Sequence, residues 1–203
     1  ATARKFVAEG AIVLATDVNV GELSSLDDGS GRVLVQKGDV TVKSEVEALV
    51  EACLQRFGRL DILVNSAGIT PRSVRPEADW ETRWDAVVKV NVKGTVLMSR
   101  ATAEAMRLGH GGSIVNIGSI MGFVGYPTSL PFSDGFNPYP ASKGAIGQIT
   151  RDMGVRLAAE GIRVNAVCPG FIYTPLTENV TKEAEVHQTM KALHPIGRLG
   201  NPE

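Results

Sequence analysis

The sequence is poor in cysteine, histidine and aromatic residues. Its 203 residues include two cysteines and three histidines, and aromatic residues make up 5%. Two cysteines, Cys53 and Cys168, cannot form the disulfide framework of a small secreted domain, so we expect a reducing compartment, the cytoplasm. The histidines His110, His187 and His194 lack the spacing of zinc ligands, and we therefore predict no metal site.

An excess of charge of one sign and a long hydrophobic run are also absent. Lys and Arg total 21 against 22 Asp and Glu, which leaves a net charge of −1. A nucleic-acid-binding protein normally shows a basic excess, so we expect no nucleic-acid partner. No apolar run approaches the roughly 18 residues that a membrane-spanning helix needs, and we expect no membrane partner.

Glycine is abundant, at 22 residues, and short apolar runs alternate with longer amphipathic segments. The runs are continuous rather than alternating, which is typical of strands buried on both faces. The amphipathic segments have helical spacing, most clearly over residues 42–57, and again from Trp80 to Met98 and over about 140–159. The predicted strands cover residues 11–15, 33–35, 60–64, 113–117 and 162–167. This alternation predicts an α/β fold, a doubly wound, Rossmann-like parallel sheet in a single domain over residues 1–203.

The two ends of the sequence do not match a complete doubly wound domain. Residues 1–10 have the character of the second half of a helix, whereas such a fold begins with a strand and a Gly-rich turn. We expect an N-terminal strand and a C-terminal helix and strand to be missing. The residues from Tyr126 to Pro138 form an apolar, proline-rich loop, which is interpreted equally well as a wall of a substrate pocket or as a packed structural insertion.

Four polar residues occupy positions that a hydrophobic core would not require. Asn91 lies on the apolar face of its helical period, and Ser119 follows a predicted strand at its carboxyl end, where ligands collect in parallel sheets. Tyr139 and Lys143 are four residues apart on one helix, so their side chains share a face. A lysine ammonium beside a phenol lowers the pKa of the phenol, which suits a general acid/base. Each residue alone has a structural explanation, but their joint occurrence in this order is specific.

With these four residues in place, the chain resembles the short-chain dehydrogenase/reductase family. The resemblance extends over nearly the whole sequence. It rests, beyond the Tyr139 and Lys143 pair, on Gly10-Ala11, Asp17, Gly38-Asp39-Val40, Asn65-Ser66-Ala67-Gly68, Asn91, Asn116–Ser119, Gly161–Asn165 and Pro169–Thr174. It implies hydride transfer between a nicotinamide cofactor and a secondary alcohol or ketone, with Tyr139 exchanging the proton. Lys143 would tune Tyr139 and hold the nicotinamide ribose, Ser119 would orient the substrate oxygen together with Tyr139, and Asn91 would hold a proton-relaying water.

The resemblance also assigns cofactor-binding residues. Asp17 would bind the adenine ribose, and its carboxylate would favour NAD over NADP by repelling a 2′-phosphate. The other assigned residues, beside Tyr139 and Lys143, are Asp39, Val40, Asn65, Ala67, Gly68, Pro169, Gly170, Ile172 and Thr174. Relatives usually form homo-oligomers, so a tetramer or dimer is implied.

Three departures from the family pattern bear on these assignments. The Gly-rich loop is absent, Asn65-Ser66 replaces Asn-Asn, and the interval from Ser119 to Tyr139 is lengthened. Tyr126 is not followed by a lysine four residues later, and we interpret it as non-catalytic. Two alternatives stay open: a cofactor-binding relative without turnover, and an epimerase or dehydratase.

Overall fold

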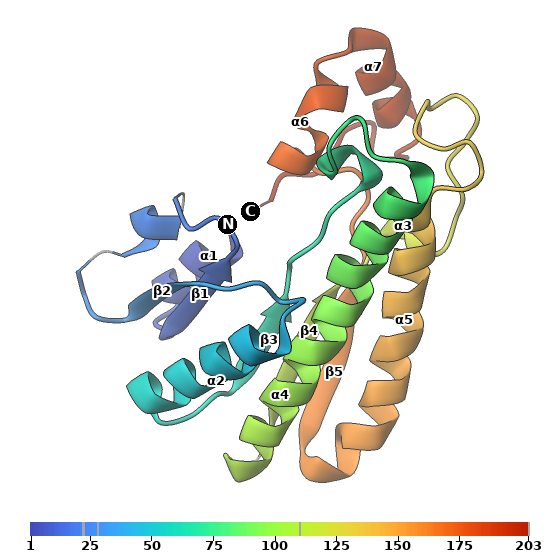
Figure 1. Cartoon of the computed structure of the whole chain (residues 1–203). Helices are drawn as coiled ribbons and strands as arrows, with labels where there is room; N and C mark the ends of the chain where they lie inside the picture. The colour runs from blue at the N-terminus through green and yellow to red at the C-terminus, as the bar shows by residue number, and fades with distance from the viewer. Residues whose placement is uncertain (22, 28, 110, 203) are drawn as a thin grey trace.

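Strands and helices alternate along the chain in the computed structural model, which describes all residues except 22, 28, 110 and 203 (Figure 1). No described helix is long and apolar enough to cross a membrane. The strands are β1 (Val13–Asp17), β2 (Val33–Lys37), β3 (Ile62–Asn65), β4 (Gly112–Ile117) and β5 (Ile162–Val167). The helices are α1 (Thr2–Ala8), α2 (Lys43–Phe57), α3 (Trp80–Val88), α4 (Thr95–Leu108), α5 (Pro138–Leu157), α6 (Pro175–Thr181) and α7 (Ala184–Ala192).

All strand pairings are parallel, as predicted. One sheet pairs β1 with β2, and the other has the order β3-β4-β5. The expected single sheet is therefore divided into two parallel parts, because β1 and β3 exchange no ladder hydrogen bonds within the described residues. Within β3-β4-β5 the carboxyl ends of the strands meet at one edge, where Asn65 is paired in register with Asn116. This edge leads into the loops that carry the predicted site residues.

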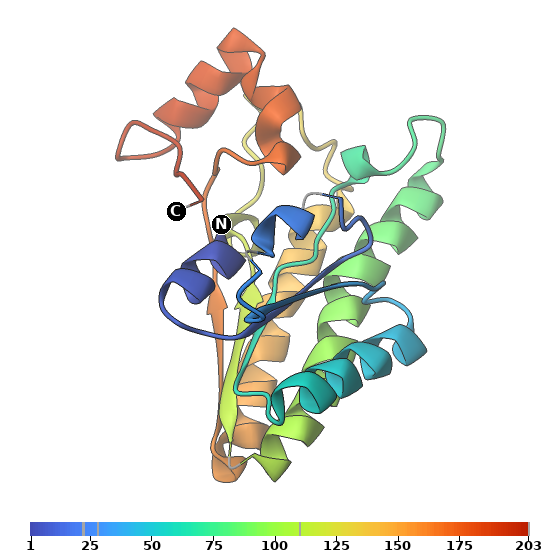
Figure 2. The same ribbon diagram turned by 90° about the vertical axis from the view of Figure 1, so that its left-hand side faces the viewer.

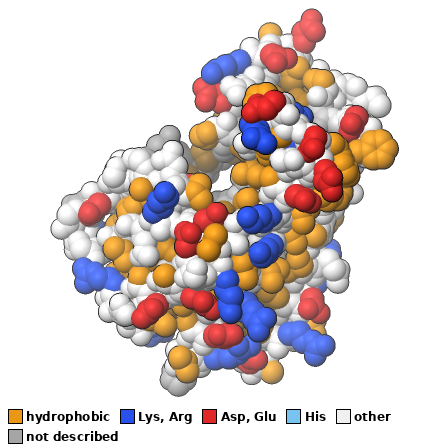
Figure 3. Space-filling view, viewed as in Figure 1, with side chains coloured by type: hydrophobic (Ala, Val, Ile, Leu, Met, Phe, Trp, Pro, Cys, Tyr) orange, Lys and Arg blue, Asp and Glu red, His pale blue; other side chains and the backbone are white. Residues whose placement is uncertain are grey.

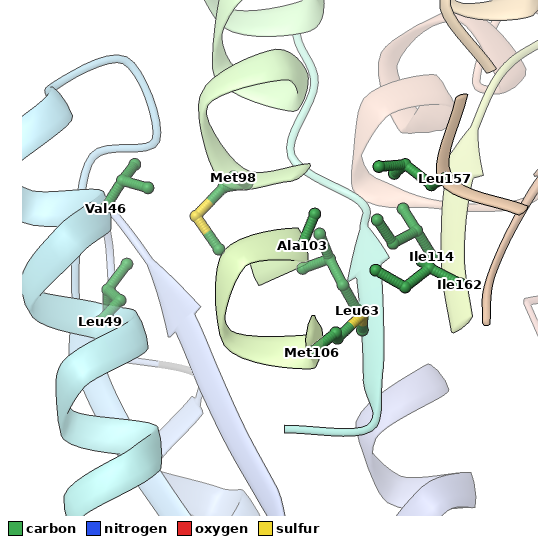
Figure 4. Close-up of a cluster of buried hydrophobic side chains, with 9 residues drawn as sticks. All are labelled: Val46, Leu49, Leu63, Met98, Ala103, Met106, Ile114, Leu157 and Ile162. Carbon is green, nitrogen blue, oxygen red and sulfur yellow. The ribbon is translucent and has the colours of Figure 1, made fainter. Parts of the chain in front are cut away.

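The main hydrophobic core lies between β3-β4-β5 and the helices α2, α4 and α5, which cover one face of this sheet (Figure 2). Ile114 and Ile162 of the sheet and Met106 of α4 are almost completely buried (Figure 4). Burial on both faces, which the apolar runs led us to expect, is not observed for every strand. Ile62 of β3 is 49% exposed and Val167 of β5 is 51% exposed, because the described helices packed on this sheet lie on its other face.

A second, smaller core joins the loop of residues 126–137 to α6 and α7. Leu130 from the loop is buried together with Val180, Met190 and Leu199, and Phe132 packs against them. The loop therefore lies against the C-terminal helices rather than extending into solvent (Figure 1). Of the two interpretations of this loop, both apply: it is a packed insertion, and its aromatic residues also line the cavity described below.

Candidate active site

Tyr139 and Lys143 lie in the first two turns of α5, and the local sequence fixes where this helix begins. The side chain of Asn137 accepts a hydrogen bond from the Tyr139 N–H at 2.9 Å, and Pro138 follows as the first helical residue. An asparagine cap followed by proline is a strong helix start. The four-residue spacing brings Lys143 Nζ to 5.7 Å from the centroid of the Tyr139 ring, as predicted.

Lys143 is buried beside the carboxyl end of β4. Its Nζ donates a hydrogen bond of 2.6 Å to the carbonyl oxygen of Ile117. Loss of hydration disfavours the charged ammonium and lowers the pKa of Lys143 from its ordinary 10.5 to about 8, a shift that nearby Cys168 opposes. The ammonium at neutral pH is thus held by one carbonyl in a place where hydration is weak.

Tyr139 is also buried, and this burial is the main influence on its ionisation. Desolvation raises the pKa of Tyr139 above its ordinary value of 10.0, while a hydrogen bond from Ser119 and the charge of Arg72 lower it. We expected Lys143 to make the pKa of this tyrosine fall. The net direction is the opposite, because desolvation of the phenolate outweighs the lowering influences, which come from Ser119 and Arg72.

Ser119 lies where β4 ends and a short 3-10 turn over residues 120–122 begins. Its Oγ accepts a hydrogen bond of 3.1 Å from the Met121 N–H, so the serine is an N-cap as well as a neighbour of Tyr139. Its side chain is 7% exposed. The structural and the functional interpretation of this serine are therefore compatible.

Asn91 lies in a π-helical turn, Lys89–Gly94, that joins α3 to α4. Its Oδ1 accepts from the Ile69 N–H at 2.8 Å, and its Nδ2 donates to the Ile69 carbonyl at 3.0 Å and to Ser142 Oγ at 3.0 Å. The amide thereby ties the loop after β3 to α5, the helix that carries Tyr139. In this structure Asn91 is a positioning residue, and its water-holding role stays a prediction.

A cavity of about 160 Å³ opens beside Tyr139 and Ser119. The loop after β3, the loop of residues 126–137 and the segment that leads from β5 into α6 form its walls, and most of its lining is apolar. Of the predicted cofactor-binding residues it includes Pro169, Gly170, Ile172 and Thr174.

Sequence reasoning missed three polar residues on this cavity: Thr70, Arg72 and Thr177. Thr70 and Arg72 lie two and four residues after the Asn65–Gly68 run at the carboxyl end of β3, a position that could have indicated them. Burial and the proximity of Tyr139 raise the pKa of Tyr126 to about 12, so its phenol stays neutral. Its interpretation as non-catalytic stays a prediction, but Tyr126 lines the same cavity as Tyr139.

The remaining predicted cofactor-binding residues lie outside the cavity lining. Asp17 ends β1, and its Oδ1 accepts from the Asn19 N–H at 2.9 Å. Asp39 Oδ1 accepts from the Thr41 N–H at 2.8 Å, and that bond holds the pKa of Asp39 below its ordinary value. Val40 follows Asp39 and packs against Gly94, where a Cβ would lie 2.6 Å from a Val40 methyl group.

Asn65 and Gly68 show how the loop after β3 is used. The Asn65 amide donates to Ser99 Oγ at 2.9 Å and to Asn116 Oδ1 at 2.8 Å, inside the protein rather than on a groove. Gly68, one residue after Ala67, lies close to both Asn91 and Lys143: a Cβ there would be 3.7 Å from Lys143 Nζ. The loop after β3 thus contacts two of the four predicted catalytic residues.

No group of three or more metal-ligating side chains is found in the part of the chain that the structure describes. His110, one of the three histidines, lies outside the described residues. His194 has a structural role, because its imidazole binds the Phe171 N–H at 3.1 Å and the Met190 carbonyl at 2.7 Å.

Comparison with known proteins shows the family of this chain. The short chain dehydrogenase family model matches residues 1–185. The chain is 38% identical to the 3-oxoacyl-[acyl-carrier-protein] reductase FabG of Thermotoga maritima, over 100% of this chain and 80% of that protein. It is also 38% identical to the cis-4-hydroxycyclohexanecarboxylate dehydrogenase of Sinomonas cyclohexanicum, over 100% of this chain and 79% of that protein.

Among solved structures, ElxO with NADP bound superposes with a TM-score of 0.82 at 27% identity, covering 97% of this chain and 79% of ElxO. The family model, the relatives and the fold all point to one family. The chain belongs to the short-chain dehydrogenase/reductase family and is an oxidoreductase that acts on CH–OH groups.

Proposed function

We propose that this oxidoreductase transfers a hydride between NAD(H) and a secondary alcohol or ketone, with Tyr139 as the general acid/base. One observation carries the proposal. The Tyr139 phenol lies on an apolar cavity, within hydrogen-bonding reach of Ser119, and shares a helix face with the buried Lys143. This arrangement can hold a carbonyl oxygen and give it a proton.

The ionisation of the site suits this proton transfer. Because burial raises the pKa of Tyr139, the phenol is protonated at neutral pH and is ready to donate in the direction of ketone reduction. Ser119 orients the same oxygen and stabilises the phenolate that Tyr139 leaves behind. Lys143, still cationic near neutral pH, provides a nearby positive charge for that phenolate.

The residues around Lys143 fit a nicotinamide cofactor. An ammonium has three N–H donors, and within the described residues Lys143 makes one hydrogen bond, to Ile117. The remaining donors suit ribose hydroxyls, and Gly68 keeps the adjacent space free of a side chain. The surface is hollowed between the part that carries β1 and β2 and the upper part that carries α6 and α7 (Figure 3). When bound, the cofactor would supply or accept the hydride.

Asp17 supports NAD as the preferred cofactor. A carboxylate at the carboxyl end of β1 would accept hydrogen bonds from ribose hydroxyls and repel a 2′-phosphate. ElxO, a structural relative, binds NADP, so within the family the choice depends on individual residues. Our proposal for this chain therefore rests on Asp17. The ratio of kcat/KM with NAD to kcat/KM with NADP should be smaller in Asp17→Asn than in the wild-type protein. A wild-type protein that uses NADP more efficiently than NAD would contradict the assignment.

The activity is tested by the substrate-dependent oxidation of reduced NAD or NADP with a panel of small ketones. We expect Tyr139→Phe to lower kcat/KM by about 100-fold or more. Tyr173→Phe is the matched control, because Tyr173 contacts His187 at 2.8 Å and does not line the cavity. Equal loss in both variants, or none in Tyr139→Phe, would overturn the role of Tyr139.

The family resemblance further leads us to propose a cytoplasmic homo-oligomer, a tetramer or dimer.

A further inference from the structure

The cavity beside Tyr139 has one charged side chain on its wall. Among the described residues that line it, Arg72 carries a positive charge and none carries a negative one. The neighbours of Arg72 on the wall include Phe132, Phe171 and Leu176, which are apolar. A neutral, purely apolar substrate would gain nothing from this cation.

Arg72 is held at the cavity by an aromatic contact and not by an acid. Its guanidinium carbon lies 4.9 Å from the centroid of the Phe132 ring. Phe132 in turn packs edge-on against Tyr126, at 5.7 Å, and Phe171, at 6.3 Å. Stacking occupies the face of a guanidinium, while its N–H donors lie in the plane and stay available for a planar anion.

Three other arginines have carboxylate partners within the described structure, whereas Arg72 has none. Arg59 is paired with Asp61, Arg107 with Glu160, and Arg75, three residues after Arg72, lies 3.9 Å from Glu77. The charge of Arg72 instead acts on the phenols of Tyr126 and Tyr139. The cation is therefore close to the reacting groups and is not neutralised.

Thr70 provides a second polar group on the same wall. It is 5% exposed, and its Oγ1 has no hydrogen-bond partner within the described residues. Thr70 is the N-cap of the short turn Pro71–Ser73, and its hydroxyl faces the Ser73 N–H there. That N–H donates its hydrogen bond to the Thr70 carbonyl oxygen at 2.9 Å. Even as a cap the hydroxyl only accepts, so its own proton has no acceptor. A buried donor without a partner beside a ligand cavity needs an acceptor that the described residues do not supply, and an oxygen of a ligand can supply it.

We propose that Arg72 and Thr70 bind an anionic group of the substrate, so that the enzyme prefers small alcohols and ketones that carry a carboxylate or an anion of similar size. This inference rests on the proposed function, since it names the substrate class for the same cavity. The cavity of about 160 Å³ has room for a small molecule of this kind. The carbonyl would face Tyr139 and Ser119 while the anion lies against Arg72 and Thr70.

The test compares oxo acids with their methyl esters, beginning with 4-oxopentanoate and methyl 4-oxopentanoate and extending the chain by one or two carbons. We expect the wild-type kcat/KM for the best acid to exceed that for its ester. Arg72→Gln should lower kcat/KM for the acid about tenfold, as loss of a charge-assisted hydrogen bond does. It should lower kcat/KM for the ester much less, because with the ester only the influence of the Arg72 charge on Tyr139 is lost. Arg72→Lys should retain part of the preference, and Thr70→Val should lose less than Arg72→Gln.

Arg75→Gln is the matched control, because Arg75 is a neighbouring exposed arginine that does not line the cavity. It should behave as wild type with both substrates. Equal turnover of acid and ester by the wild-type protein would overturn the proposal. An equal loss for both substrates in Arg72→Gln would also overturn it, because Arg72 would then act on Tyr139 or on the loop and not on the substrate anion.

A binding measurement separates this inference from the proposed function. If the wild-type protein turns over no ketone, the proposed function fails, and the subsite is then judged by calorimetric titration of the protein with 4-oxopentanoate and its ester. Tighter binding of the acid that is lost in Arg72→Gln would support the anion subsite. Equal affinity for acid and ester would contradict it.

Discussion

Gly122 holds α5, the helix that carries Tyr139 and Lys143, at its observed distance from the end of β4, and replacing it with alanine should disturb both stability and activity. A Cβ at Gly122 would lie 2.7 Å from the carbonyl oxygen of Lys143 and 3.1 Å from the amide nitrogen of Gly144. Both contacts are with the backbone of α5, which cannot rotate away as a side chain can. The close approach therefore requires a residue without a Cβ.

The size of the effect follows from these distances. A carbon and a carbonyl oxygen rarely approach closer than about 3.3 Å, so in Gly122→Ala the two backbones must separate by about 0.6 Å. Overpacking of this kind typically costs about 1–3 kcal/mol of unfolding free energy. The displacement moves Lys143 and Tyr139 relative to Ser119, and an error of about 1 Å at reacting groups can cost about 100-fold. We therefore expect kcat to fall about tenfold.

Gly125 supplies the control, because a Cβ there would meet nothing within 4 Å. Urea unfolding followed by tryptophan fluorescence would give the stabilities of Gly122→Ala and Gly125→Ala, and ketone-dependent nicotinamide oxidation would give their rates. Gly125→Ala should match the wild-type protein in both assays. If Gly122→Ala were as stable and as active as Gly125→Ala, the argument that this contact positions α5 would be refuted.

Three other variants test the site. Ser119→Ala removes a hydrogen bond that lowers the pKa of Tyr139, so the midpoint of the pH profile for alcohol oxidation should move to higher pH; an unmoved midpoint would contradict this. Asn91→Ala leaves the Ile69 backbone groups unpaired and should cost about 2–4 kcal/mol in urea unfolding. Lys143→Met removes a buried cation whose pKa falls from 10.5 to about 8. This variant should be inactive yet no less stable at neutral pH, and its relative stability should fall as pH rises from 8 to 10.5, where the wild-type penalty disappears.

Local sequence signals predicted much of the fold. The helix predicted over residues 42–57 is observed as Lys43–Phe57, and it ends at Gly58, whose φ of 79° is in the left-handed region that glycine favours. The strand predicted over 162–167 has the predicted bounds. The π-helical turn around Asn91 was not predicted, because its apolar spacing continues that of the flanking helices and no residue marks the change.

The site was predicted where a motif is local and missed where it depends on tertiary packing. Tyr139 and Lys143 are joined by helix geometry alone, so their spacing sufficed. Arg72 gains its significance from Phe132, a residue 60 positions later in a loop, and nothing in the sequence joins the two. The direction of the Tyr139 pKa was predicted wrongly for a related reason: the degree of burial, which decides it, is a property of the folded chain.

The central claim is that this chain passes a hydride to a carbonyl carbon while Tyr139 provides the proton. The most direct test uses reduced NAD that carries deuterium at both C4 positions of the nicotinamide, with mass spectrometry of the alcohol formed from a ketone substrate. We expect one deuterium at the carbinol carbon with the wild-type protein, and formation of that product about 100-fold slower or more with Tyr139→Phe. An alcohol without deuterium, or equal rates for the two proteins, would contradict the account.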